Sequence, residues 1–113
     1  MGYGFGRQLR LRKTDEYSSV FAFRKAVRSP LFELRYCPGA TPNPRLGLVV
    51  GKRFARLAVQ RNLVKRLARE RFRQLRSELP AYDLVLRVRA KVMDDCRKRL
   101  GQEIEFLFRR LPR

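Results

Sequence analysis

Between Lys52 and Arg76 the sequence contains ten Lys or Arg residues and a single acidic residue, Glu70. Like charges at this density repel one another when they lie on the same side of a helix. The segment therefore folds most readily if its apolar residues gather on one side and pack on a core. Its cations would then gather on the other side, where a polyanionic partner can balance them.

A helix from about Ala58 to Leu79, ended by Pro80, sorts the residues in this way. At about 100° per residue, the apolar side chains fall in one half of the helical wheel and most of the polar ones fall in the other. The predicted apolar face consists of Leu63, Val64, Leu67, Ala68, Phe72, Leu75 and Leu79. The predicted polar face consists of Asn62, Lys65, Arg66, Arg69, Arg73 and Arg76. Arg61 lies at the seam, and Arg71 falls within the apolar face, where its side chain would have to snorkel toward solvent.

Two interpretations of the polar face are open. A solvated helix face usually mixes signs, with acids and bases four residues apart. Here Lys65, Arg69, Arg73 and Arg76 follow one another with no acid among them. This pattern favours a face that binds a polyanion, and Arg can hold a phosphate with two hydrogen bonds at once. The sequence indicates a nucleic acid but does not identify which one.

The other segments predict an α+β fold. A short helix at 15–23 is capped by Thr14, strands are expected at 24–29, 31–37, 46–50 and 82–89, and a last helix covers 93–111. Asp94 or Asp95 caps that helix, whose core-facing residues are Cys96, Leu100, Ile104, Leu107 and Leu111. This order predicts a two-layer α+β sandwich, in which a sheet of about four strands is covered by three helices.

The strand at 31–37 alternates clearly. Phe32, Leu34 and Tyr36 point to one face, and Glu33 and Arg35 point to the other, so we expect a half-buried strand with one wetter face. The glycines at both ends of the segment 47–51 are expected to let another backbone come close.

Length and charge limit the possible classes of protein. The 113 residues fit one domain at 9–113, preceded by a flexible arm at 1–8. A formal charge of +18 favours a polyanionic partner. No apolar run approaches the roughly 20 residues of a membrane span, and no secretion signal is present, so we expect a cytoplasmic protein without membrane contact. With no His and with Cys37 and Cys96 isolated, a zinc site is not expected, and both cysteines are interpreted as reduced thiols.

The stretch RLGLVVGKRFARLAVQRNLVKRLARERFR, residues 45–73, resembles the signature of the protein subunit of bacterial ribonuclease P. The resemblance lies in the Arg-Leu-Gly before a strand, the basic pair Lys52 and Arg53, and the ungapped block that begins at Arg61 and Asn62. It extends to the flanking segments and spans most of residues 9–111. The family usually has Arg at the position of Leu63, which belongs to the predicted apolar face here.

The resemblance implies a fold and a function. The fold, also described for a ribosomal protein domain, has about four strands, three helices and a left-handed βαβ crossover. The family forms a ribonucleoprotein that removes the 5′ leader of precursor tRNA, so the protein would be the non-catalytic subunit of an endoribonuclease. The RNA would hold the active site and most of the Mg²⁺, and neither a catalytic nor a metal-binding residue is assigned to the protein. A monomer in a 1:1 complex with the RNA is expected.

The resemblance also suggests which residues bind RNA. Those expected to contact the catalytic RNA are Lys52, Arg53, Arg56, Arg61, Asn62, Lys65, Arg66, Arg69 and Arg73. The single-stranded leader is expected in a cleft between the first helix, the sheet and the basic helix, near Tyr17, Phe21, Arg35 and Lys65. Aromatic rings can stack on unpaired bases. The alternative for Tyr17 and Phe21 is that they hold the first helix to the sheet.

Two other functions fit the composition. One is a ribosomal or structural RNA-binding protein with no role in catalysis. The other is a DNA-binding helix-turn-helix protein, which would need a short helix joined to the basic helix by a tight turn, and the sequence predicts no such pair.

Overall fold

The structure, a computed structural model, describes residues 10–11, 14–93 and 97–112. The predicted arm at 1–8, the caps Asp94 and Asp95, and Cys96 lie outside these residues. The elements are α1 (Thr14–Phe23), β1 (Lys25–Arg28), β2 (Phe32–Pro38), β3 (Arg45–Val49), α2 (Ala58–Leu75), the 3₁₀ turn η2 (Arg76–Glu78), β4 (Tyr82–Val88) and α3 (Arg97–Arg110). The predicted α+β fold with a four-stranded sheet and three helices is confirmed.

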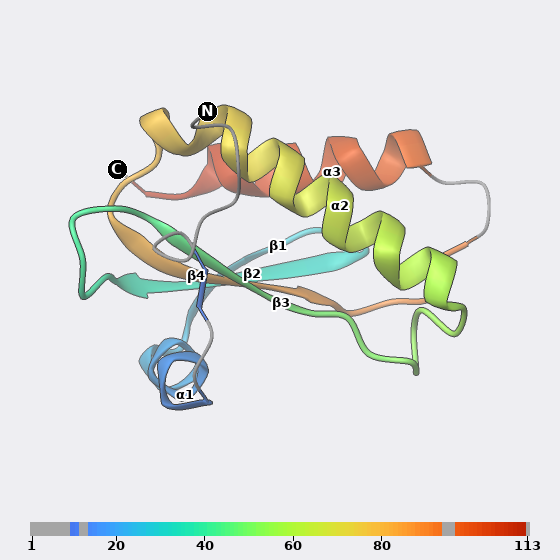
Figure 1. Ribbon diagram of the computed structural model, residues 1–113, viewed down its shortest axis with the longest axis horizontal. Helices are drawn as coiled ribbons and strands as arrows, with labels where there is room; N and C mark the ends of the chain where they lie inside the picture. The colour runs from blue at the N-terminus through green and yellow to red at the C-terminus, as the bar shows by residue number, and fades with distance from the viewer. Residues whose placement is uncertain (1–9, 12–13, 94–96, 113) are drawn as a thin grey trace.

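The sheet has the strand order β1-β2-β4-β3. Its first two pairings are antiparallel, whereas β3 and β4 are parallel and are connected through α2. The helices α2 and α3 lie side by side on one face of the sheet, and α1 lies on the opposite face (Figure 1). Each face of the sheet is therefore covered, although by different amounts of chain.

The main hydrophobic core lies between the sheet and the pair α2 and α3. Its largest fully buried side chains include Phe32, Phe72 and Phe108, one each from β2, α2 and α3. The apolar face predicted for the basic helix is confirmed, because its buried residues are Val64, Leu67, Ala68, Phe72 and Leu75. The predicted stripe of the last helix is confirmed at Leu100, Ile104, Leu107 and Leu111.

A second, smaller core lies beneath α1. Leu11, Val20, Cys37 and Val85 form it, and Tyr17, Phe21 and Val49 pack against it. The prediction that β2 is only half buried was therefore wrong. Because α1 covers its second face, Glu33 is only 4% exposed and Cys37 only 7%.

The end of the basic helix also differs from the prediction. The α-helix ends at Leu75 and continues as η2 before Pro80, instead of running to Leu79. Arg71, which falls within the apolar face, is accommodated at the contact with α3. It forms ion pairs with Glu70 and Glu105, and a Cβ added to Gly101 of α3 would lie 2.9 Å from its guanidinium. Gly101 is unfavourable within a helix, but here it makes room for the Arg71 side chain.

Candidate nucleic-acid interface

The polar face of α2 forms a continuous basic surface, which we call the α2 strip. Its members are Asn62, Lys65, Arg66, Arg69 and Arg73, all exposed or partly exposed. Within the part of the chain that the structure describes, none of the four cations of the α2 strip forms an ion pair with an acid. The structure thus keeps the positive charge of the strip available to an external anion.

Acidic side chains of the protein pair with arginines that do not belong to the α2 strip. Seven acids whose side chains the structure describes each form an ion pair with an arginine outside the α2 strip; they are Glu16, Glu33, Glu70, Glu78, Asp83, Glu103 and Glu105. The described residues also contain no group of three or more His, Cys, Asp or Glu side chains that could hold a metal ion.

The α2 strip approaches the α1 side of the molecule at the edge strand β3. Arg10 forms a parallel bridge to Leu46 of β3, which places Arg10 and Leu11 along this edge. Burial lowers the pKa of Arg69, the positive charge of Arg10 lowers it further, and Tyr17 acts in the opposite direction. The helices α1 and α2, which carry Tyr17 and Arg69, cover opposite faces of the sheet (Figure 1).

The loop before α2 carries three exposed cations, Lys52, Arg53 and Arg56. Arg61 was expected to contact RNA, but its guanidinium points back to this loop. Its Nη1 donates hydrogen bonds to the carbonyl oxygens of Ala55 and Arg56, each at 2.9 Å. Arg61 therefore braces the loop that presents the other cations.

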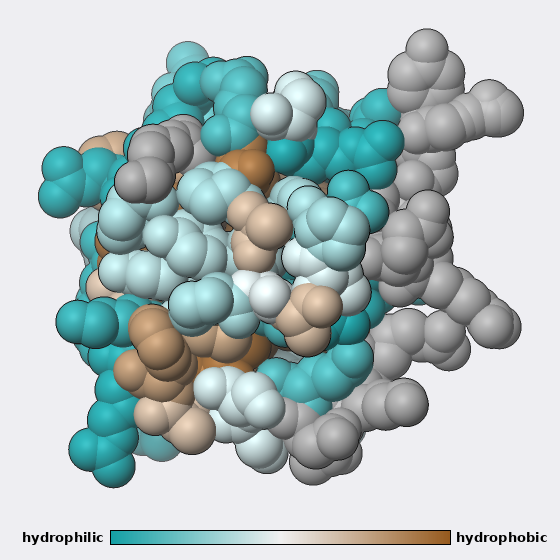
Figure 2. All heavy atoms as spheres, turned by 90° about the vertical axis from the view of Figure 1, so that its left-hand side faces the viewer, coloured by the Kyte–Doolittle hydropathy of each residue, from teal (hydrophilic) through white to brown (hydrophobic). Residues whose placement is uncertain are grey.

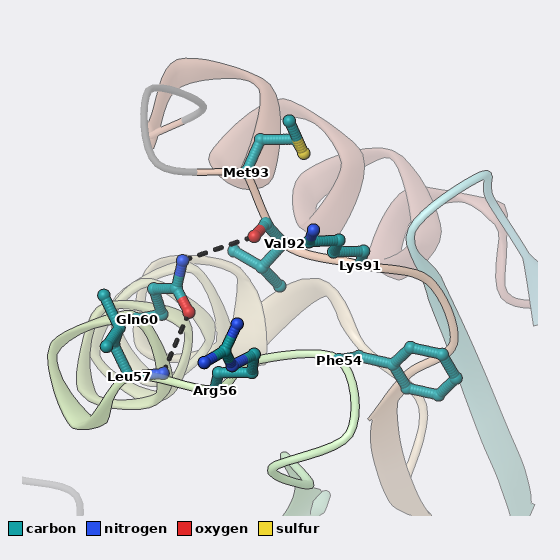
Figure 3. Close-up of a pocket in the computed structure, with 7 residues that line it drawn as sticks. All are labelled: Phe54, Arg56, Leu57, Gln60, Lys91, Val92 and Met93. Atoms are coloured by element: carbon teal, nitrogen blue, oxygen red, sulfur yellow. Dashed lines mark hydrogen bonds between the residues drawn. The ribbon is translucent and has the colours of Figure 1, made fainter.

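The first turn of α2 is fixed by Gln60. The backbone N–H of Leu57 donates to its side-chain oxygen at 3.0 Å, and its side-chain nitrogen donates to the Val92 carbonyl at 3.3 Å. These bonds cross a pocket of about 270 Å³ between the loop and the segment after β4, with Arg56 and Lys91 at its wall (Figure 3). Leu63, one turn further along, packs against the main core, which confirms its place on the apolar face.

Tyr17 holds α1 to β3. Its hydroxyl oxygen accepts a hydrogen bond from the Leu48 N–H at 3.2 Å, and its ring lies over Gly47, where an added Cβ would be 2.6 Å from the ring. The predicted close approach at Gly47 is thus made by a side chain and not by a backbone. Tyr17 remains partly exposed despite this anchoring contact.

Phe21 and Arg35, which were both expected near the leader, lie together. The Arg35 guanidinium carbon lies 5.0 Å from the centre of the Phe21 ring, and that of Arg87 lies 5.7 Å from it. Lys65, also expected near the leader, lies on α2 in the layer across the sheet (Figure 1). Sequence reasoning missed Arg87, since its place beside Phe21 depends on strand register, for which the sequence carries no clear signal.

No helix within the described residues combines the length and the apolar character needed to cross a bilayer. Figure 2 shows the end of the molecule at the left of Figure 1, where hydrophilic side chains interrupt the hydrophobic areas.

Known proteins resemble this chain over most of its length. The family described as Ribonuclease P matches residues 5–112. The ribonuclease P protein component of Azoarcus sp. (strain BH72) is 55% identical over 103 residues, covering 91% of this chain and 86% of the relative. The protein of the same description from Aromatoleum aromaticum is 46% identical and covers 82% of this chain and 85% of its own.

Solved structures are similar over nearly the whole chain. An RNase P protein from Staphylococcus aureus superimposes with a TM-score of 0.79 at 26% identity, covering 89% of this chain and 93% of the other. The RNase P protein from Thermotoga maritima gives a TM-score of 0.76 at 26% identity, covering 92% and 98%.

Proposed function

Because this chain belongs to the ribonuclease P protein family, we propose that the α2 strip and the loop at 51–57 are the surfaces that hold the catalytic RNA. The protein is a subunit of ribonuclease P that binds RNA and takes part in tRNA 5′ processing. The observation that carries the proposal is the separation of charge described above. The acids pair with arginines elsewhere, whereas Lys65, Arg66, Arg69 and Arg73 of the strip stay unpaired within the described chain.

The substrate contact in this proposal is the single-stranded 5′ leader of precursor tRNA. Tyr17, Phe21 and Arg35 on the α1 side of the sheet contact it, and Lys65 reaches it from the α2 strip. Partly exposed aromatic rings beside guanidinium groups are suited to unpaired nucleotides, which offer base faces and phosphates together. The protein would thus distinguish precursor tRNA from mature tRNA by gripping the leader.

Catalysis in this proposal belongs to the RNA subunit. Mg²⁺, bound mainly by the RNA, would supply Lewis-acid and water-activating chemistry there. In this proposal the protein contributes binding and orientation, and no metal ligand is assigned to it. The complex is proposed to contain one protein and one RNA, in the cytoplasm.

The test is cleavage of precursor tRNA by a bacterial ribonuclease P RNA at low Mg²⁺, with and without the protein. We expect the protein to stimulate leader removal and to tighten binding of precursor over mature tRNA. A matched comparison uses the double variant Lys65→Ala/Arg69→Ala from the strip and Arg99→Ala/Arg109→Ala from α3, which remove equal charge. Equal activation by all three proteins, or no activation by the unmodified protein, would contradict the proposal.

A further inference from the structure

We infer that the pocket beside the first turn of α2 holds one unpaired base of the catalytic RNA. Leu57 and Met93, which line it, contact the base, and Arg56 and Lys91 contact the phosphates beside that base. We call these four residues the base pocket. The inference rests on the proposed function and deepens it, because it names the part of the RNA that this end of the molecule binds.

The base pocket lies away from the surface proposed for the leader. Figure 1 shows the loop before α2 and the end of β4 at the right, whereas α1 lies at the left. The pocket is lined by residues of that loop, of the start of α2 and of the segment 91–93. It therefore adjoins the loop at 51–57, which carries part of the surface proposed for the catalytic RNA.

Hydrogen bonds hold the walls of the pocket together. The backbone N–H of Val92 donates to the Phe54 carbonyl oxygen at 2.8 Å, and the Val92 carbonyl oxygen accepts from Gln60 Nε2 at 3.3 Å. Gln60 in turn accepts from the Leu57 N–H at 3.0 Å. The Val92 side chain is only 2% exposed, so the segment is also anchored in the main core. The pocket is therefore formed by the fold itself, and a ligand that enters it need not order the walls.

Two exposed apolar side chains border the pocket. Leu57 is 52% exposed and Met93 is 61% exposed. Single exposed apolar residues are common on protein surfaces, but these two line one hollow in a chain whose formal charge is +18. Apolar surface in water is unfavourable, and a flat ring placed against the two side chains would cover it. The thioether of Met93 also makes favourable contacts with aromatic rings.

The charged side chains of the pocket are all positive. Arg56 and Lys91 are both exposed, and no acidic side chain is among the described residues that line the pocket. In Figure 3 the Arg56 side chain points from the loop toward the segment 91–93. Apolar surface flanked by cations complements a ligand that joins an aromatic ring to a negative charge. A nucleotide has both parts, and single strands are bound by such a combination of stacking contacts and positive charge.

The size of the pocket limits the ligand to a single base. Its volume is about 270 Å³, below the roughly 300 Å³ at which pockets for drug-sized ligands begin. A nucleobase is smaller than such a ligand, whereas a stack of several bases is not. Bases within an RNA helix are covered by their neighbours, so the base that enters the pocket is an unpaired one that is turned outward.

The first experiment follows the methyl group of Met93 by NMR. The chain contains two methionines, Met1 and Met93, so a protein isotope-labelled at the methionine methyl groups gives two signals, and Met93→Leu identifies the second. Addition of a bacterial ribonuclease P RNA should move the Met93 signal upfield, because a methyl group over the face of an aromatic base is shielded. Polyphosphate, a polyanion without bases, is the control and should not move the signal upfield.

The second experiment compares the affinity of the same RNA for the unmodified protein, Leu57→Ala/Met93→Ala and the matched control Val59→Ala/Phe106→Ala. The control also removes two exposed apolar side chains, at 68% and 50% exposure, but neither lines the pocket. We expect the pocket variant to lose about tenfold in affinity, as for loss of the contact with one base, and the control to retain its affinity. Because no charge is removed, the slope of log affinity against log salt should stay the same in both variants.

The outcomes separate the inference from the proposed function. If the unmodified protein binds the RNA and stimulates leader removal but the Met93 signal does not move upfield, no base enters the pocket, and the proposed function stands. An equal upfield shift with polyphosphate, or equal affinities of the pocket variant and the control, would likewise overturn the inference. Thermal melting establishes that the variants fold; if the pocket variant does not, the NMR result on the unmodified protein decides. Failure of the unmodified protein to bind the RNA would instead count against the proposed function itself.

Discussion

Arg45 and Asp83 face each other across the parallel strands β3 and β4 and are joined by two hydrogen bonds. The Nε and Nη2 atoms of Arg45 donate to the two carboxylate oxygens of Asp83, each at 2.9 Å, and Nη1 donates to Glu16 of α1 at 2.7 Å. The hydrogen bond to Asp83 is the largest cause of a raised Arg45 pKa, with Glu16 adding to it against the effect of burial. One side chain thus links α1, β3 and β4.

Replacing Arg45 should destabilise the fold. Its side chain is 12% exposed and that of Asp83 is 7%, so Arg45→Ala leaves a nearly buried carboxylate without its partner. We expect the free energy of unfolding to fall by about 3 kcal/mol. Arg45→Lys should also lose stability, because an ammonium cannot reproduce the paired hydrogen bonds. Urea denaturation measures the change. Arg109→Ala breaks exposed ion pairs and should lower the free energy of unfolding by less than about 1 kcal/mol. Equal losses in Arg45→Ala and Arg109→Ala would show that the Arg45 network stabilises the fold no more than an exposed ion pair does.

Single substitutions in the α2 strip should change the salt dependence of RNA binding. Each phosphate contact releases counterions, so Lys65→Ala and Arg69→Ala should each reduce the slope of log affinity against log salt by about one. Titrations of the catalytic RNA at several salt concentrations measure it. Arg109→Ala on α3 is the control and should keep the slope. Unchanged slopes for both strip variants would mean that the strip is a solvated face.

The contact between Gly47 and Tyr17 should show strong coupling. Gly47→Ala places a methyl group 2.6 Å from the Tyr17 ring, and we expect a loss of about 1–3 kcal/mol in unfolding free energy. In a Tyr17→Ala background most of this added cost should disappear, because the clash has no partner. Gly51→Ala is the matched control, since a Cβ there meets nothing within 4 Å. If Gly47→Ala lowered the unfolding free energy equally in both backgrounds, the destabilisation would not come from contact with the Tyr17 ring.

Stability should fall with acid partly through Glu103. Burial acts to raise its pKa, but hydrogen bonds from Ser29 and the Leu31 N–H, with the charge of Arg99, produce a net lowering. A lowered folded-state pKa contributes stability that is present above the unfolded value of 4.5 and is lost as pH falls through the folded value. Unfolding free energies from about pH 6 to about pH 3 test this. At about pH 6, Glu103→Gln should have a lower free energy of unfolding than the unmodified protein, and it should lose less of that free energy as the pH falls to about 3. If the free energies of the two proteins fell in parallel with pH, Glu103 would be excluded as a contributor.

The sequence predicted those parts of the structure that repeat with a regular period. The two faces of α2 followed from its helical wheel, and the α+β order followed from the alternation of helical and extended segments. The resemblance of residues 45–73 then led to the family that the comparisons show, and the ribosomal and helix-turn-helix alternatives are not supported by that match.

Features that depend on pairs distant in sequence could not be predicted. The burial of Glu33 requires α1 on the second face of the sheet, and its partners require the β1–β2 and β2–β4 registers. Arg61 could be assigned to the polar seam of α2, but its bonds to Ala55 and Arg56 depend on how the preceding loop turns back. The place of Arg71 within the apolar face of α2 depends on Gly101 of α3, which leaves room for its guanidinium.

The parallel pairing of β3 with β4 has a consequence for the order of folding. Arg45 and Asp83 are register partners but lie 38 residues apart along the chain, and α2 lies between them. Pairings of high contact order form slowly, since the intervening loop must close first. Here that loop carries a helix whose charges repel one another until a counter-anion arrives. We expect polyanions to speed the closure of the sheet as well as to stabilise the finished fold, so that the RNA would act as a folding template for its own protein partner.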